Sequence, residues 1–193
     1  MYTIRRVEML IYAEYTARSP RTELLLGLTQ LNFLRALITN MDVLHLSPAQ
    51  MDDEALSPFN LIGPRYPEYQ DSSLPSALHP TAIQSTISHH PWLDLLPIPK
   101  MRDHLILAGN SFDDVQLCHD LCGYRNSETG QTGMIVWKDP WDPAGWEVTE
   151  TFLKTWGWAV RGSWDLFQST NYWRMKRGEK PLFLLPPQAE RLT

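Results

Sequence analysis

The chain has 193 residues and a formal net charge of −5, with 43% hydrophobic and 20% charged residues, a balance typical of one globular domain. At this length folding buries roughly 70% of the unfolded surface, so stability requires neither a metal nor a disulfide. The acidic balance argues against direct nucleic-acid binding, which needs a clustered basic face. No apolar run approaches ~20 residues, so we expect no membrane-spanning helix.

The numbers of proline, tryptophan and cysteine residues predict further features of the protein. The 15 prolines predict many fixed corners and short helices, and the 8 tryptophans predict either an aromatic core or an aromatic ligand cavity. The only cysteines, Cys118 and Cys122, are four apart on one predicted helix face, where a disulfide is geometrically awkward. We therefore expect reduced thiols in an intracellular protein. Because the chain has no second cysteine pair and no glycine-rich phosphate loop, we expect no metal and no cofactor.

The first predicted helix runs from about Arg21 to Leu46 and lies between two Ser-Pro pairs. Its apolar residues follow the spacing of one helix face. They are Leu24, Leu25, Leu28, Leu31, Leu34, Leu37, Ile38, Met41 and Leu44. A heptad seam from Leu24 would include Arg35 and Asp42. The wide stripe therefore favours a core helix over a leucine zipper.

The middle of the chain alternates proline-rich loops with short helices. Residues 58–80 are predicted to form a loop or an extended wrapping segment. Helices are predicted over 81–88, 99–107 and 111–122, and Ser111 is the expected N-cap of the third. Gly123 is predicted to end the third of these helices. The one predicted strand covers 134–137.

Three further helices are predicted towards the C-terminus, over 143–156, 158–167 and 170–177, with Gly157 and Ser169 at the breaks. Together these elements predict a mainly α, compact single-domain helical bundle with at most one short β-hairpin and long Pro-rich loops. The predicted organisation is an N-terminal arm or short helix over 1–20, a helical domain over 21–185 and a flexible tail over 186–193.

Two adjacent histidines, His89 and His90, are the first candidate site. With Trp92 and Asp94 beside them, two imidazoles could perform acid–base chemistry near neutral pH. The structural alternative is that one histidine caps a helix and the other bonds a backbone carbonyl.

Seven of the eight tryptophans lie between residues 137 and 173, where they could line an apolar ligand cavity or fill a core. Asp142 is expected to cap a helix, whereas Asp139 could act as a base or accept a ligand hydrogen bond. Glu147 is placed in a first helical turn, where a carboxylate favours the helix dipole.

Asn171 and Arg174 share a face of the last predicted helix. Arg174 could anchor a ligand, or it could pair with an aspartate of the 139–142 loop. The predicted catalytic residues are His89, His90 and Asp139. The predicted substrate-binding residues are Trp92, Asp94, Trp137, Trp141, Asn171, Trp173 and Arg174.

Ten short sequence pieces occur in an order that resembles a known family. They are Leu34–Asn40, Leu78–Thr81, His89–Trp92, Asp94–Pro97, Met101–Asp103, Ile135–Trp137, Asp139–Pro143, Gly145–Thr149, Trp156–Trp158 and Ser169–Arg174. Between about Leu24 and Leu182 the chain resembles the uncharacterised domain that follows the basic leucine zipper in many fungal transcription factors. Only about 20 residues precede the first helix, with neither a basic region nor a zipper. The family's DNA-binding role is therefore not expected, and the domain is predicted to stand alone.

Two functions follow as expectations. The first is a pocket protein of fungal secondary metabolism that binds an apolar small molecule and catalyses its cofactor-free cyclisation or isomerisation. Orientation alone can supply about 7–11 kcal/mol in such catalysts. The alternative is a metabolite-sensing or partner-binding regulatory domain of the transcription-factor family that the chain resembles. We expect a cytoplasmic location, or a nuclear one for the regulatory alternative, and a possible homodimer.

Overall fold

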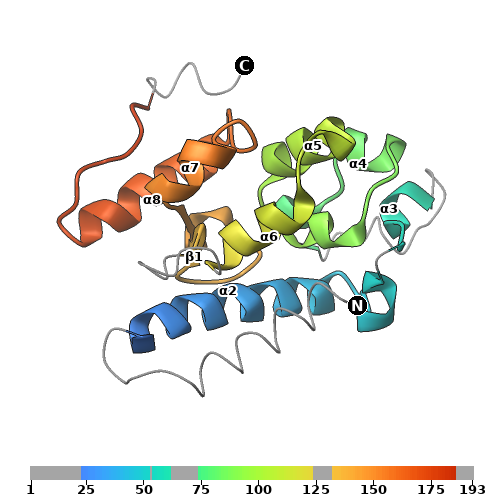
Figure 1. Ribbon diagram of the computed structural model, residues 1–193, viewed down its shortest axis with the longest axis horizontal. Helices are drawn as coiled ribbons and strands as arrows, with labels where there is room; N and C mark the ends of the chain where they lie inside the picture. Colours follow the sequence, from blue (N-terminus) through green and yellow to red (C-terminus); the bar gives the residue numbers. More distant parts are fainter. Residues whose placement is uncertain (1–22, 53, 62–73, 124–131, 186–193) are drawn as a thin grey trace.

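The computed structural model describes residues 23–52, 54–61, 74–123 and 132–185 (Figure 1). Within these residues the fold is mainly α with one two-stranded sheet, which confirms the predicted class. The predicted N-terminal arm and C-terminal tail lie outside the described residues. No helix in the described part of the chain is long and apolar enough to cross a membrane.

Helix α2 (Glu23–Val43) lies along one side of the molecule, beneath the remaining elements in Figure 1. Phe33 and Met41 are buried, whereas Leu28 and Leu31 are 49% and 41% exposed. The predicted apolar face is therefore wrong at these two leucines, because Phe33 and Ala36 turn a different side of the helix to the core. The helix ends earlier than predicted, since His45 adopts a positive φ of 54° and Leu46 N donates to Met41 O.

Short helices form a second group, which lies over the middle and the C-terminal end of α2 in Figure 1. Thr81 caps α4 through a reciprocal bond with Gln84, and Pro99 opens α5 as predicted. Gly123 ends α6 with φ 81°, also as predicted, but the N-cap is Asp113 rather than Ser111. The elements are η1 (Pro48–Met51), α3 (Pro58–Leu61), η4 (Ser76–Leu78), α4 (Ala82–Thr86), η5 (Pro91–Leu95), α5 (Pro99–Ala108), η6 (Gly109–Ser111) and α6 (Asp114–Cys122).

A small antiparallel sheet pairs β1 (Met134–Val136) with β2 (Trp146–Val148), and η7 (Pro143–Gly145) precedes β2. The predicted strand is confirmed, but the predicted helix over 143–156 is wrong in its first half. Pairing with β1 buries Trp146 completely, and this gain outweighs local helix propensity. Within 143–156 the chain forms the short 3-10 helix η7, the strand β2 and then α7 (Glu150–Trp156), which is the only α-helix there.

Helix α8 (Trp164–Lys176) is one continuous helix where two were predicted. The chain breaks earlier, at Gly162 with φ 71°. Ser169 is therefore an interior residue of α8, and its Oγ donates to Ala144 O at 2.8 Å instead of capping a helix.

The apolar residues form two core clusters. The larger one surrounds Trp146, whose ring meets Phe33 edge-on at 5.8 Å. The smaller one contains Met41, Phe59 and Leu95, and half-buried Trp92 contacts both clusters. Buried Asn40 donates from Nδ2 to Leu95 O and Pro140 O, so one α2 amide fixes two chain segments.

Candidate functional site

His89 and Asp94 form a buried ion pair within a polar network. His89 follows α4 and Asp94 lies in η5, and their Nε2 and Oδ1 atoms are 2.9 Å apart. Asp94 is fully buried and also accepts from Ser57 Oγ at 2.7 Å and Gln84 Nε2 at 2.6 Å. Three donors on one carboxylate are the arrangement that stabilises a buried negative charge.

The hydrogen-bond partners of His89 favour its doubly protonated form. Gln84 Oε1 accepts from Arg102 Nε and from Thr81 N, so its amide nitrogen must face Asp94. Asp94 Oδ1 is therefore an acceptor, and His89 Nε2 donates to it. Nδ1 lies 2.7 Å from Ile87 O, which can only accept, so the site suits a His89 ring that carries a proton on both nitrogens. Burial acts to lower the pKa of His89, but the bond to Asp94 and its charge raise it above its ordinary value.

Arg102 is a buried member of this network that the sequence analysis did not select. Its guanidinium donates to Gln84 and to the carbonyls of Ala77, Leu96 and His79. Burial lowers its pKa to about 10, against the opposing charges of Asp94 and Asp103, so it stays charged at neutral pH. The available signal was an arginine inside an apolar helix face, next to Met101.

His90 has a different set of partners. Its Nδ1 accepts from Trp92 N at 3.1 Å and so caps η5, and its Nε2 donates to Asp52 O at 2.8 Å. The four ring nitrogens of the two histidines thus all have partners within the protein. In this arrangement neither imidazole has a nitrogen left to exchange a proton with a substrate.

Trp137 and Trp173 form a partly exposed stack with a cation over each ring. Their rings stack at 5.4 Å, with Lys138 over Trp173 and Arg177 over Trp137. Arg177 donates to both oxygens of buried Glu147, and Trp137 Nε1 donates to the same carboxylate at 2.8 Å. These bonds raise the pKa of Arg177. Glu147 therefore lies in β2 and pairs with a cation, which corrects its predicted place in a helical turn.

Asn171 and Arg174 hold the segment that follows α8. Buried Asn171 bonds the backbone of Leu182 and Phe183, and Arg174 Nε donates to Lys180 O. Arg174 pairs with Glu150 at 2.9 Å and with Glu179 at 3.4 Å. The predicted pairing with the 139–142 loop is therefore wrong.

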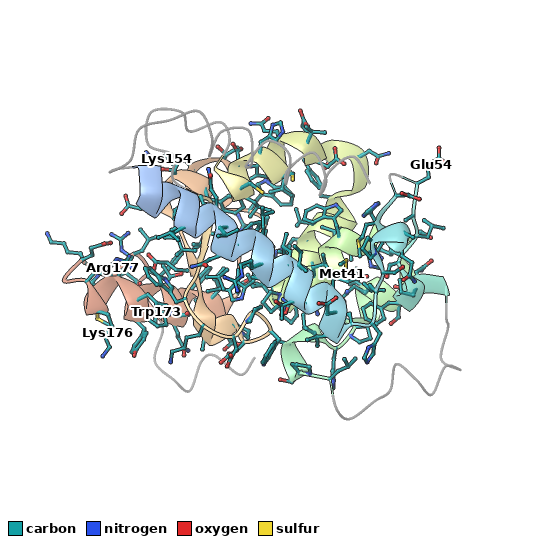
Figure 2. All side chains as sticks on the ribbon, turned by 90° about the horizontal axis from the view of Figure 1, so that it is seen from below. Met41, Glu54, Lys154, Trp173, Lys176 and Arg177 are labelled. Carbon is teal, nitrogen blue, oxygen red and sulfur yellow. The ribbon has the colours of Figure 1, made fainter. Side chains whose placement is uncertain are left out.

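The remaining predicted residues lie apart from one another. Asp139 is exposed, and half-buried Trp141 packs against the smaller core. The structure brings His89 together with Asp94, and Trp137 together with Trp173. Figure 2 shows Trp173 and Arg177 at one end of the molecule and Glu54, near α3, at the opposite end.

An open cleft of about 680 Å³ lies beside α8, within the range of roughly 300–1,000 Å³ common for ligand sites. The cleft lies between one face of α8 and the residues of η7, η4 and the start of α5. Ser169 Oγ and Trp173 Nε1 both donate to Ala144 O, which fixes η7 as a wall. The lining residues are Ser76, Ala77, Pro99, Lys138, Asp142, Pro143, Ala144, Asp165, Gln168, Ser169 and Tyr172.

None of the ten predicted site residues lines this cleft. Asp142 lines it, and its Oδ1 also caps η7 by accepting from Ala144 N, so the predicted capping role is confirmed for a shorter helix. Among the described residues no three His, Cys, Asp or Glu side chains are grouped so as to hold a metal ion, and Cys118 and Cys122 are free thiols.

The fold and these sites define a small, mainly helical domain with a buried His–Asp–Arg network and a charged cleft. A family model described as "Domain of unknown function (DUF3425)" matches residues 60–167, more than half of the chain, and the chain belongs to this family. The matched residues include His89, Asp94 and Arg102. No curated protein and no solved structure matches the chain. The resemblance to fungal leucine-zipper transcription factors stays a prediction.

Proposed function

We propose that the chain is a regulatory domain that binds a small polar molecule in the cleft beside α8. One observation carries this proposal, the convergence of polar side chains from separate segments on one hollow. Asp165, Gln168 and Tyr172 occupy one face of α8, opposite Lys138 and Asp142. Within the described part of the chain, the side chains of Asp165 and Gln168 have no hydrogen-bond partner, so a ligand could bind them without breaking an existing contact.

The lining of the cleft favours a polar ligand over the apolar one that the sequence suggested. It carries two carboxylates, one ammonium group and a half-exposed tyrosine ring. Apolar ligands gain affinity by burying their surface against apolar walls, whereas charged side chains in a cleft orient ligands that bear hydrogen-bonding groups.

Binding is favoured over catalysis because of how the two histidines are held. Acid–base chemistry needs a group within hydrogen-bond reach of the reacting proton. The ring nitrogens of His89 and His90 are already hydrogen-bonded to Asp94, to two backbone carbonyls and to the backbone N–H that His90 caps. Cofactor-free cyclisation stays a prediction, and the same binding experiment separates it from sensing.

The test is native mass spectrometry of the full chain after incubation with the polar small-molecule fraction of a fungal culture. Gln168→Arg places a bulky cation in the cleft, and Gln116→Arg on α6 makes the same change away from it. We expect the parent chain and Gln116→Arg to retain the same compound, and Gln168→Arg to lose it. Retention that is equal in all three proteins, or absent in all three, contradicts the proposal.

The recovered compound decides between the two functions. Release of the unchanged compound supports sensing, because a sensor only binds its ligand. Recovery of a rearranged isomer with the same mass and a different chromatographic retention time would support the predicted cyclase or isomerase instead.

A further inference from the structure

The segment that carries α3 is fastened to the chain around His89 by four hydrogen bonds. Ser57 N donates to His89 O at 2.8 Å, and Ser57 Oγ donates to Asp94 Oδ2 at 2.7 Å. Ser88 Oγ donates to Asn60 Oδ1, and His90 Nε2 donates to Asp52 O. Ser57 Oγ also accepts from Phe59 N at the start of α3. Ser57 is therefore the point where α3 and the buried ion pair meet.

We propose that the His89–Asp94 pair is a pH-sensitive latch for α3, closed when His89 carries both ring protons and released when it loses one. Release would free Ser57 from Asp94 and let Phe59 leave the smaller core. This inference concerns the end of the domain near α3 and does not depend on ligand binding in the cleft.

The geometry leaves a neutral His89 without a satisfactory arrangement. If the proton on Nδ1 is lost, the ring lone pair faces Ile87 O, which is also an acceptor. If the proton on Nε2 is lost, the lone pair faces the Asp94 carboxylate oxygen at 2.9 Å. Either tautomer places two acceptors against each other in a buried site, which is more costly than losing an exposed hydrogen bond.

No described neighbour is placed to replace the missing proton. The charged groups around His89 are Asp94 of η5 and, beyond Gln84, Arg102 of α5. The guanidinium of Arg102 donates to Gln84 and to three backbone carbonyls. Asp103 of α5 accepts from Thr81 at the start of α4, and His90 and Asp52 are joined through the Asp52 carbonyl. Residues 58–61 of α3 itself include no titratable side chain.

The sign of the pH effect follows from the charged state that the fold favours. Asp94 makes the proton on His89 harder to remove in the folded domain than in the unfolded chain. The latch therefore contributes its full stability below the ordinary histidine pKa and loses it as the pH rises through the raised pKa. Protection of α3 should be high in mildly acidic solution and should fall in mildly alkaline solution.

The experiment is hydrogen–deuterium exchange of the full chain between pH 6 and pH 8.5, corrected for the intrinsic pH dependence of amide exchange. We expect peptides covering 54–61 to lose protection several-fold across this range, while peptides from α8 keep theirs. NMR titration of the His89 ring in the unmodified chain should give the same midpoint as the loss of protection.

Two variants complete the test. His89→Gln keeps one donor but cannot titrate, so the pH dependence of residues 54–61 should disappear. His104→Gln changes another partly buried histidine, which bonds Ala159 O between α5 and the turn before α8, and should leave the pH dependence intact. Flat protection of 54–61 in the parent chain overturns the latch. It is also overturned by pH dependence that survives in His89→Gln, or by a midpoint that differs from the ring titration.

Discussion

Arg177 binds Glu147 through two hydrogen bonds, of 2.6 and 2.8 Å, and so joins the end of α8 to the buried strand β2. Glu147 is 2% exposed, and a buried carboxylate needs such a partner because desolvation otherwise disfavours its charge. The same pair positions Trp137, whose indole donates to Glu147 and whose ring lies beneath Arg177.

Arg177→Met should lower the free energy of unfolding by about 2 kcal/mol, less than for a fully buried pair because the arginine side chain is a third exposed. Arg174→Met is the matched control. Its partners Glu150 and Glu179 have side chains that are 56% and 41% exposed, so no buried charge is left unpaired and we expect a loss below about 1 kcal/mol. Urea denaturation measures both, and equal losses would contradict the structural role assigned to Glu147.

Ser57→Ala should destabilise the domain by about 1–2 kcal/mol, because it removes the hydroxyl that both donates to buried Asp94 and accepts from Phe59 N. Ser88→Ala removes an exposed bond to Asn60 and should cost less than about 0.5 kcal/mol. A thermal-melting comparison decides the matter, and a Ser57→Ala variant as stable as Ser88→Ala would show that the Asp94 contact contributes little.

The pH dependence of global stability gives a third prediction. Because His89 has a raised pKa in the folded domain, its contribution is present below the ordinary histidine pKa and is lost as the pH rises through the raised value. The parent chain should therefore lose stability relative to His89→Gln between pH 6 and pH 8.5. Parallel stability curves for the two proteins would show that His89 is not held in its charged form.

Gly133→Ala should destabilise the domain by roughly 1–3 kcal/mol through overpacking. A Cβ atom at this position would lie 2.5 Å from Phe152 Cδ2 and 2.7 Å from the backbone oxygen of Asp120, which cannot easily move. Gly178→Ala is the control, because it has open space around it and only the strain of its positive φ, which costs about 1 kcal/mol. Calorimetry should rank Gly133→Ala as the less stable variant.

Local signals in the sequence were sufficient for several elements. Pro99 at the start of α5, Gly123 at the end of α6 and the apolar run of β1 each act through their own backbone geometry. Strand β2 could not be found in this way, because Glu147 reads as a helix former until its distant partner Arg177 is known. The end of α2 was missed because a histidine, His45, occupies a position that usually favours glycine.

Some of the candidate site residues could likewise be predicted from local sequence, and others only from the packing of distant segments. The neighbourhood of His89 and Asp94 was visible because the two residues are five apart in one segment. Arg102 was not selected, because its partners, Gln84 and three backbone carbonyls, come from other segments of the chain. Asp165, Gln168 and Tyr172 read as an ordinary solvated helix face, and only the packing of η7 and η4 against α8 makes that face the wall of a cleft.

The most direct test of ligand binding uses the tryptophan indoles as reporters in NMR spectra of the full chain. Trp173 Nε1 donates to Ala144 O in the cleft wall. Trp156 Nε1 of α7 donates instead to Asp120 of α6, and neither of these two residues lines the cleft. On addition of the polar metabolite fraction, the Trp173 indole signal should shift while the Trp156 signal stays in place. An unchanged Trp173 signal, or an equal shift of both, would contradict a ligand site in the α8 cleft.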